Sequence, residues 1–252
     1  MGAIATRTST RRSAAQLGFW AAILTVVVAA VFAAVAIPTP PRSGPFCQSA
    51  CVPYPYVDVA QFIPGDYLWL VPGILLAVIF VMLMGCIHAY AAEPKRIYTR
   101  IGLSFAVAYA VVILVDYFVQ LTVVLPSLQA GETEGLSLFT QYDPHGLFIA
   151  LESLGYAMLT IALLCAAPAF AGGRVEGAIR WLFVSSFGLM VVAFVGLAVV
   201  RRDLVAFEVT VLMIIWIVLI ASGVLLAVVF RRAAPALHDD AEPPTGSALR
   251  SA

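Results

Sequence analysis

Six long apolar segments run through this chain, at residues 17–37, 67–91, 101–125, 146–170, 181–200 and 204–230. Each has about 20 residues or more, which at a rise of about 1.5 Å per residue is enough to cross a hydrocarbon layer of about 30 Å. Inside such a layer no water can bond to the backbone, so each segment must pair its own amide and carbonyl groups as an α-helix. The predicted fold is therefore all-α, a polytopic bundle of six transmembrane helices.

The composition also indicates that the chain lies in a lipid bilayer. Only 11% of the 252 residues are charged and 62% are hydrophobic, whereas a soluble domain is about 25% charged. A surface with so few charges suits a lipid bilayer, which is the first predicted partner. The formal net charge is zero, and nothing in the composition indicates a nucleic-acid partner. The Ala- and Val-rich, Lys-poor sequence is typical of a high-GC bacterium, so a bacterial origin is expected.

The basic residues predict the orientation of the bundle. An even number of spans places both ends on one side, and positive residues accumulate in cytoplasmic segments. With cytoplasmic ends, three of the 14 Lys and Arg residues lie outside and 11 inside, namely Arg7, Arg11, Arg12, Lys95, Arg96, Arg100, Arg174, Arg180, Arg231, Arg232 and Arg250. Both termini are therefore predicted to be cytoplasmic, in a multi-pass protein of the cell (plasma) membrane. The outer pair Arg201–Arg202 is the exception to this pattern.

The connections between the spans are too short to form a soluble domain. The chain is predicted to have one membrane domain over residues 1–232 and a disordered cytoplasmic tail over 233–252, with the sequence AAPALHDDAEPPTGSALRSA. The first span follows basic residues, as a signal peptide would. Its apolar stretch is longer than the core of about 7–15 residues in a signal peptide, so it is interpreted as an uncleaved span.

Two spans contain acidic side chains well inside them, Asp116 in the third and Glu152 in the fourth. A further acid, Glu208, lies near the start of the sixth span, where an interfacial ion pair with Arg201 is the favoured interpretation. A carboxylate at membrane depth costs about 2.5–3.5 kcal/mol on insertion scales. Such groups therefore face a bundle interior, a polar partner or water rather than lipid. Asp116 and Glu152 are the first candidates for a functional site.

Helical spacing groups polar side chains around both acids. In the third span Tyr109, Asp116 and Gln120 are separated by seven and then four residues, which places them on one stripe of a helix. The fourth span repeats this spacing at His145, Glu152 and Tyr156. A short connection makes the two spans antiparallel neighbours. Glu152 is then expected within about 3 Å of the depths of both Gln120 and Asp116, with Tyr156 one turn deeper than Glu152. The sequence therefore predicts a polar cluster in the outer half of the membrane.

Three roles fit such a cluster. Two carboxyl groups this close in a low dielectric should not both ionise, so one is expected to hold a proton. A protonated acid beside a carboxylate can relay protons or bind a ligand or cation, and it can act as general acid and base on a substrate. The third role is a structural hydrogen-bond network that fixes helix packing.

His145 follows Asp143 and Pro144 at the predicted outer mouth. Asp143 can cap the fourth helix, with Pro144 in its first turn. Alternatively, His145 acts as a gate or proton acceptor above the cluster. One His and two acids could also hold a metal ion, but no ligand motif supports this, and neither a metal nor a cofactor is predicted.

Cys47 and Cys51 lie in the first outer connection, in the run FCQSACVPY. Outside the cytoplasm such a pair can oxidise, and a disulfide would fix this Pro-rich segment over the mouth of the bundle. A redox-active pair is an alternative, although the spacing is not C-x-x-C. A pair of free thiols is the third interpretation.

Two runs, VMLMGCIHAYAAEPKRIYTRIGLSFAVAYA and PHGLFIALESLGYAMLTIALLCAAPAF, resemble a family of small, uncharacterised prokaryotic multi-span membrane proteins. The similarity covers about residues 67–183. It is carried most specifically by His145, Glu152, Gly155 and Tyr156 in the fourth span, and by Tyr117 with Gln120 in the third. The family has no settled activity, so the resemblance implies the membrane class and no catalytic role.

The favoured function is a non-enzymatic membrane protein that binds or passes a small ligand, proton or ion through the cluster between spans three and four. One alternative is an intramembrane enzyme that acts on a lipid or other apolar substrate with Asp116 and Glu152 as acid and base. The other is a structural or assembly subunit of a membrane complex. The predicted partners are accordingly a small-molecule, ion or lipid ligand, and either a second copy of the chain or another membrane protein.

Overall fold

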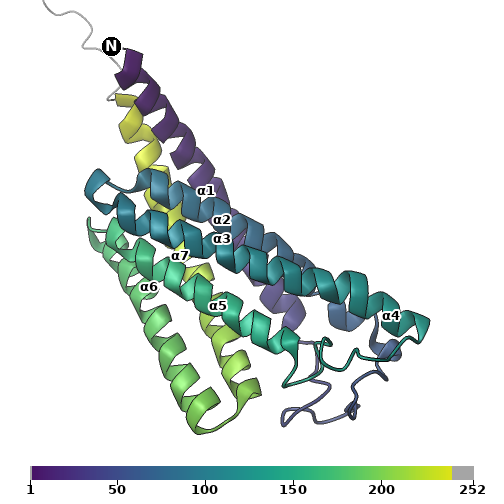
Figure 1. The fold of residues 1–252 in the computed structure, drawn as a ribbon. Coiled ribbons are helices and arrows are strands. Elements are labelled where there is room, and N and C mark those ends of the chain that lie inside the picture. The colour runs from purple at the N-terminus through teal and green to yellow at the C-terminus, as the bar shows by residue number, and fades with distance from the viewer. Residues whose placement is uncertain (1, 240–252) are drawn as a thin grey trace, which may run out of the picture.

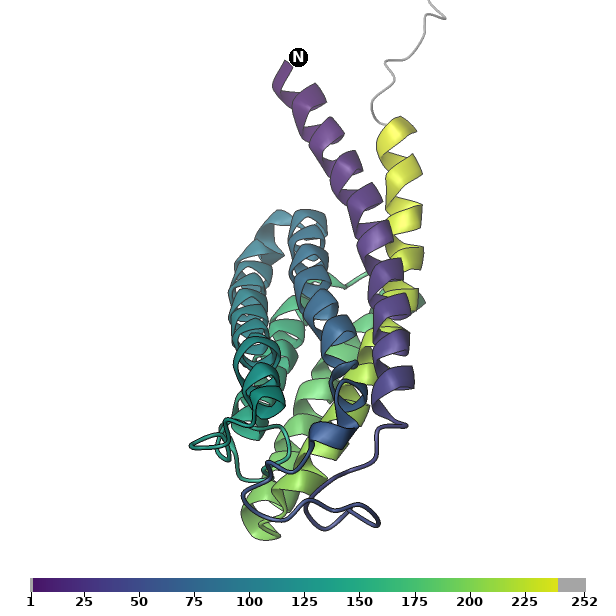
Figure 2. The same cartoon turned by 90° about the vertical axis from the view of Figure 1, so that its right-hand side faces the viewer.

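The computed structural model describes the backbone of residues 2–239 and the side chains of residues 13–233. Every regular element in this part is helical, and six helices are long and apolar enough to cross a membrane, which confirms the predicted fold class (Figure 1). The α-helices are α1 (Gly2–Ala36), α2 (Leu70–Tyr90), α3 (Arg96–Val119), α4 (Leu125–Ala130), α5 (Leu147–Ala166), α6 (Arg174–Ala193) and α7 (Leu204–Asp239). Figures 1 and 2 place both ends of the described chain at one end of the bundle, here named the terminal end.

The third span is longer than predicted. It begins at Arg96 rather than at 101, and Pro126 does not end it, because a π-helical turn over Gln120–Val124 joins α3 directly to α4. A proline ring normally clashes with the carbonyl group one turn earlier. The wider π turn relieves that clash. The helix ends instead at Gly131, whose φ of 76° lies in the left-handed region that glycine adopts without strain.

The last helix also exceeds its prediction. Helix α7 continues to Asp239, whereas the disordered tail was expected from 233. Residues 240–252 of that predicted tail lie outside the described part of the chain.

Neighbouring helices of the bundle approach each other closely at glycine residues. Helices α3 and α5 are packed neighbours, as expected for spans three and four. A Cβ atom at Gly102 of α3 would lie 2.8 Å from the carbonyl oxygen of Ala162 in α5. Helices α1 and α7 are packed in the same way, because a Cβ atom at Gly223 would lie 2.6 Å from Val26. Close backbone approach at small residues is the usual means of helix association in lipid.

The first and last helices pack against each other where Gly223 meets Val26. Beyond this contact, α1 and α7 diverge toward the opposite end of the bundle (Figure 2). That opposite end, named the loop end, carries the connections 37–69, 131–146 and 201–203. The candidate site lies there.

Candidate functional site

Glu152 is the centre of a hydrogen-bond cluster inside the loop-end half of the bundle. Its side chain projects from α5 and the residue is only 1% exposed. The hydroxyl groups of Tyr117 in α3 and Tyr156 in α5 both donate to the same carboxyl oxygen, Oε1, and the Tyr156 bond is 2.9 Å long. The two hydroxyl oxygens are 3.3 Å apart. Two phenols thus replace the water that this buried carboxyl group has lost.

Packing fixes the Tyr117 ring against Glu152. A Cβ atom at residue 73 of α2 would overlap the Tyr117 ring, so the ring can occupy this position only because residue 73 is glycine. Trp69 meets the ring edge-on with centroids 5.5 Å apart, and Phe148 stacks on it at 6.0 Å. Such pairs are favourable beyond their buried area. The hydroxyl group of Tyr117 is therefore held toward Glu152 by neighbours from α5 and from the start of α2.

A second carboxyl group meets Glu152 from α7. The Glu208 side chain lies within hydrogen-bonding reach of the Glu152 carboxyl group. Because a carboxylate can only accept hydrogen bonds, a bond between two carboxyl groups requires a proton on one of them. Glu208 thus joins Glu152 in the wall of one cavity, whereas the sequence predicted Asp116 as the acid beside Glu152.

The pair borders a cavity of about 410 Å³ at the loop end. The cavity lies between the end of α1, the start of α5 and the first turns of α7, and residues of connections 37–69 and 131–146 cover it. Most of its wall is apolar, with aromatic side chains at Phe32, Trp69, Phe148 and Trp216. These rings contact one another in sequence, Phe148 with Trp69, Trp69 with Phe32, and Phe32 with Trp216. The cavity is an aromatic chamber with two acids in its wall, the arrangement expected of a small-molecule site.

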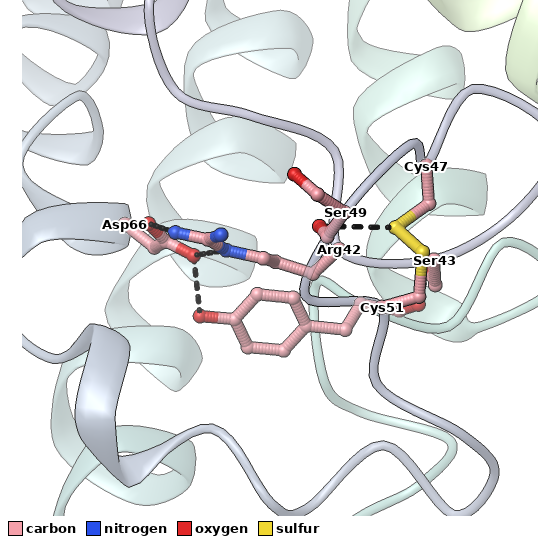
Figure 3. The surroundings of a disulfide bond; sticks show 7 residues. Arg42, Ser43, Cys47, Ser49, Cys51 and Asp66 are labelled. Carbon is pink, nitrogen blue, oxygen red and sulfur yellow. Dashed lines mark hydrogen bonds and ion pairs between the residues drawn. A yellow bond between two sulfur atoms is a disulfide. The ribbon is translucent and has the colours of Figure 1, made fainter.

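Asp66 lies in the wall of this cavity and binds residues of both connections that cover it. Figure 3 shows its bonds to Arg42. Arg42 binds it with two hydrogen bonds of 2.9 and 3.2 Å, and the Tyr142 hydroxyl group donates to the same carboxylate at 3.4 Å. The Arg42 guanidinium also stacks on Phe62 at 3.6 Å. The hydrogen bonds to Asp66 raise the pKa of Arg42 above its ordinary value, against the effect of burial. Burial, followed by the charges of Tyr67 and Asp66, raises the pKa of Tyr142.

Gln120 is buried, but its side chain bonds to loop backbone groups rather than to the carboxyl pair. Its amide nitrogen donates to the carbonyl oxygen of Phe139, and its amide oxygen accepts from the backbone N–H of Gln141 at 3.2 Å. The Gln141 side chain continues to the backbone oxygen of Asp66 at 3.2 Å. Gln120 therefore ties the end of the third span to the backbone of connection 131–146.

Asp116 and Tyr109 are buried as their stripe predicted, yet they do not border the cavity. The Oδ2 atom of Asp116 is buried and has no hydrogen-bond partner among the described residues. Tyr109 packs edge-on against Phe80, with centroids 5.4 Å apart. The third span thus contributes Tyr117, one position beyond Asp116, to the site.

His145 lies on the exposed surface of the loop end. Its backbone N–H donates to Asp143 at 2.9 Å. Helix α5 begins at Leu147 with Gly146 as its cap and without a side-chain cap, so the predicted capping by Asp143 is wrong. Asp143 stabilises the preceding turn instead. Among the described residues no group of three or more His, Cys, Asp and Glu side chains is arranged around a metal position.

Cys47 and Cys51 form a disulfide with a Cα–Cα separation of 5.8 Å (Figure 3). Phe46, beside the first of these cysteines, lies in the cavity wall. The disulfide loop thus contributes a side chain to the covering of the cavity.

Helical spacing predicted neither Glu208 nor Tyr117 as part of the site, and Tyr117 was marked only by the resemblance to the membrane-protein family. Glu208 is an acid inside the sixth apolar segment, a signal that could have marked it. Nothing in the sequence indicates that α7 would bring it to α5. Tyr117 lies about 100° around the helix from Asp116, so the stripe that selected Asp116 excluded it.

We expect Tyr117→Phe to reduce stability because it removes a donor to Glu152 while keeping the ring in place. Hydrogen bonds between membrane helices are worth about 0.6–1.7 kcal/mol. A double-mutant cycle with Glu152→Gln, measured by reversible unfolding in detergent, should give a coupling energy of that size. Tyr98→Phe, at an exposed tyrosine near the terminal end, is the matched control. A coupling energy of zero would show that the bond makes no net contribution.

We expect Asp66→Asn to loosen the covering of the cavity. The amide keeps the size of the carboxylate but loses its charge, and a hydrogen bond to a charged group contributes about 1.5–3 kcal/mol. Hydrogen exchange in segments 38–64 and 131–146 should become faster. Asp58→Asn, an exposed acid of the same connection, is the control. Equal exchange in both variants would contradict the role given to Asp66.

No family model matches the chain, and no curated protein or solved structure matches it either. The resemblance to small prokaryotic membrane proteins therefore stays a prediction. Function is inferred below from the cavity and the side chains around it.

Proposed function

We propose that this multi-pass membrane protein binds a small amphiphilic molecule in the loop-end cavity. The observation that carries the proposal is the position of Glu152 and Glu208 in the wall of an otherwise aromatic and aliphatic chamber of about 410 Å³. Such a wall favours a ligand with an apolar body, and the two carboxyl groups favour one polar group at a defined place. A purely structural network would not need a chamber beside it.

The ligand reaches the chamber from the membrane, between α1 and α7. The two helices diverge toward the loop end (Figure 2). Wall residues on both sides of the opening are also exposed at the protein surface, Ile37 at 63%, Val209 at 49% and Met213 at 43%. An apolar molecule dissolved in lipid would meet these side chains before it meets the acids.

The two alternative functions receive less support. An enzyme that uses Asp116 and Glu152 would need both at the substrate, but Asp116 does not border the cavity. An assembly subunit would bury its acids against a partner chain, yet Glu152 already has two hydroxyl partners within the protein.

The protein is proposed to lie in the plasma membrane with the terminal end in the cytoplasm. The excess of 11 basic residues over three supports this orientation. The cavity then opens in the outer half of the membrane, and the disulfide lies on the side where disulfides persist.

We expect Glu132→Cys, in the exposed 131–146 connection, to react with a membrane-impermeant maleimide in intact cells. Ala92→Cys, in the exposed turn between α2 and α3, should react only after the cells are permeabilised. The opposite pattern of labelling would reverse the orientation. Labelling of neither position before permeabilisation would place the protein in an internal membrane.

We expect Leu212→Trp to exclude the ligand by filling the cavity, because Leu212 lies in its wall. Native mass spectrometry of the gently extracted wild-type protein should detect a bound small molecule that this variant lacks. Ile217→Trp, on the lipid-facing side of the same helix, should retain it. The same bound mass in all three proteins, or none in the wild type, would overturn the proposal.

A further inference from the structure

We propose that the Glu152–Glu208 pair binds an organic ammonium ion in exchange for one proton. The inference rests on the proposed function and names the class of ligand. Both carboxyl groups border the cavity and lie within hydrogen-bonding reach of each other. A pair held together by one proton carries one negative charge, and a cation that enters can displace that proton and interact with two.

No basic side chain in the described part of the chain neutralises the pair. The groups that face it are Tyr117, Tyr109 and Asp116 from α3 and Tyr156 from α5. The only basic residue of the cavity wall is Arg42, and its guanidinium is already bound to Asp66 by two hydrogen bonds. The charge required to balance two carboxylates must therefore come from outside the protein.

The wall of the cavity selects an organic cation over an inorganic one. A small metal ion needs several oxygen or nitrogen ligands, whereas this wall is dominated by apolar side chains. An ammonium group is attracted to the faces of aromatic rings as well as to carboxylates. The rings at Phe32, Trp69, Phe148 and Trp216 can supply such faces beside the acids.

The exchange is balanced in atoms and charge. The ammonium ion enters from the membrane or the outer solution, the proton shared by Glu152 and Glu208 leaves to water, and no covalent bond other than the O–H bond changes. The pair then holds two negative charges and one positive charge, as it did with the proton. Raising the pH removes the competing proton, so affinity for the cation should rise with pH by up to tenfold per pH unit.

Benzyltrimethylammonium is a suitable probe because its charge does not titrate, and neopentylbenzene is its neutral isostere. Binding of each to the full-length protein in nanodiscs would be measured between pH 6 and pH 9. We expect tighter binding of the cation as pH rises, with about one proton released per cation in weakly buffered solution. The neutral isostere should bind with no pH dependence.

Substitutions at Glu208 test whether the released proton comes from the Glu152–Glu208 pair. Glu208→Gln should lower the affinity for the cation at least tenfold at pH 9 and flatten its pH dependence, whereas Glu208→Asp keeps the charge and should retain both. Glu132→Gln, an exposed acid of connection 131–146, is the control. A pH dependence that is lost in Asp116→Asn and kept in Glu208→Gln would overturn the assignment to the pair.

The outcomes separate this inference from the proposed function. If the cation and the isostere bind equally at every pH, the cavity binds apolar molecules and the exchange is wrong. If neither binds, and Leu212→Trp also leaves the retained mass unchanged, both proposals fail. Binding of the cation without release of a proton would overturn the exchange alone.

Discussion

The loop-end half of the bundle depends on the burial of one carboxyl group, that of Glu152. Removing such a group from water costs several kcal/mol unless protein groups replace the lost hydrogen bonds. Two phenols and a second carboxyl group do so here, and they come from α3, α5 and α7. Three helices that are far apart in sequence are therefore tied to one point, and the aromatic side chains around it pack against that same point.

The loops that cover the cavity are likewise held together by one carboxylate, that of Asp66. Asp66 stands just before α2 and receives hydrogen bonds from the first connection, through Arg42, and from the second, through Tyr142. Gln120 adds a further tie from the end of α3 to the second connection. Because these loops share partners, the covering should move as a unit. Access to the cavity from the loop end is thereby linked to a few polar contacts.

Length and hydropathy were enough to predict six helices and their approximate positions, because each apolar span must satisfy its backbone by itself. They could not predict the continuation past Pro126, which depends on a π turn that no local pattern marks. Helical spacing correctly placed Asp116, Gln120, Glu152 and Tyr156 in the interior. It did not predict their partners, because the rotation of each helix and its approach to its neighbours are decided by packing, as at Gly73 against Tyr117 and at Gly223 against Val26. Glu208 was visible as an intramembrane acid, but its neighbour belongs to the tertiary structure.

The positions of α1 and α7 also carry a consequence for biosynthesis. Both helices contribute residues to the cavity wall, and they are the first and last of the six described spans. While the protein is being made, the cavity stays without one wall and without Glu208 until the final helix has entered the membrane. Glu152 must spend that interval with only its tyrosine partners. A chain truncated before residue 204 can thus contain most of the bundle and still lack a closed binding chamber.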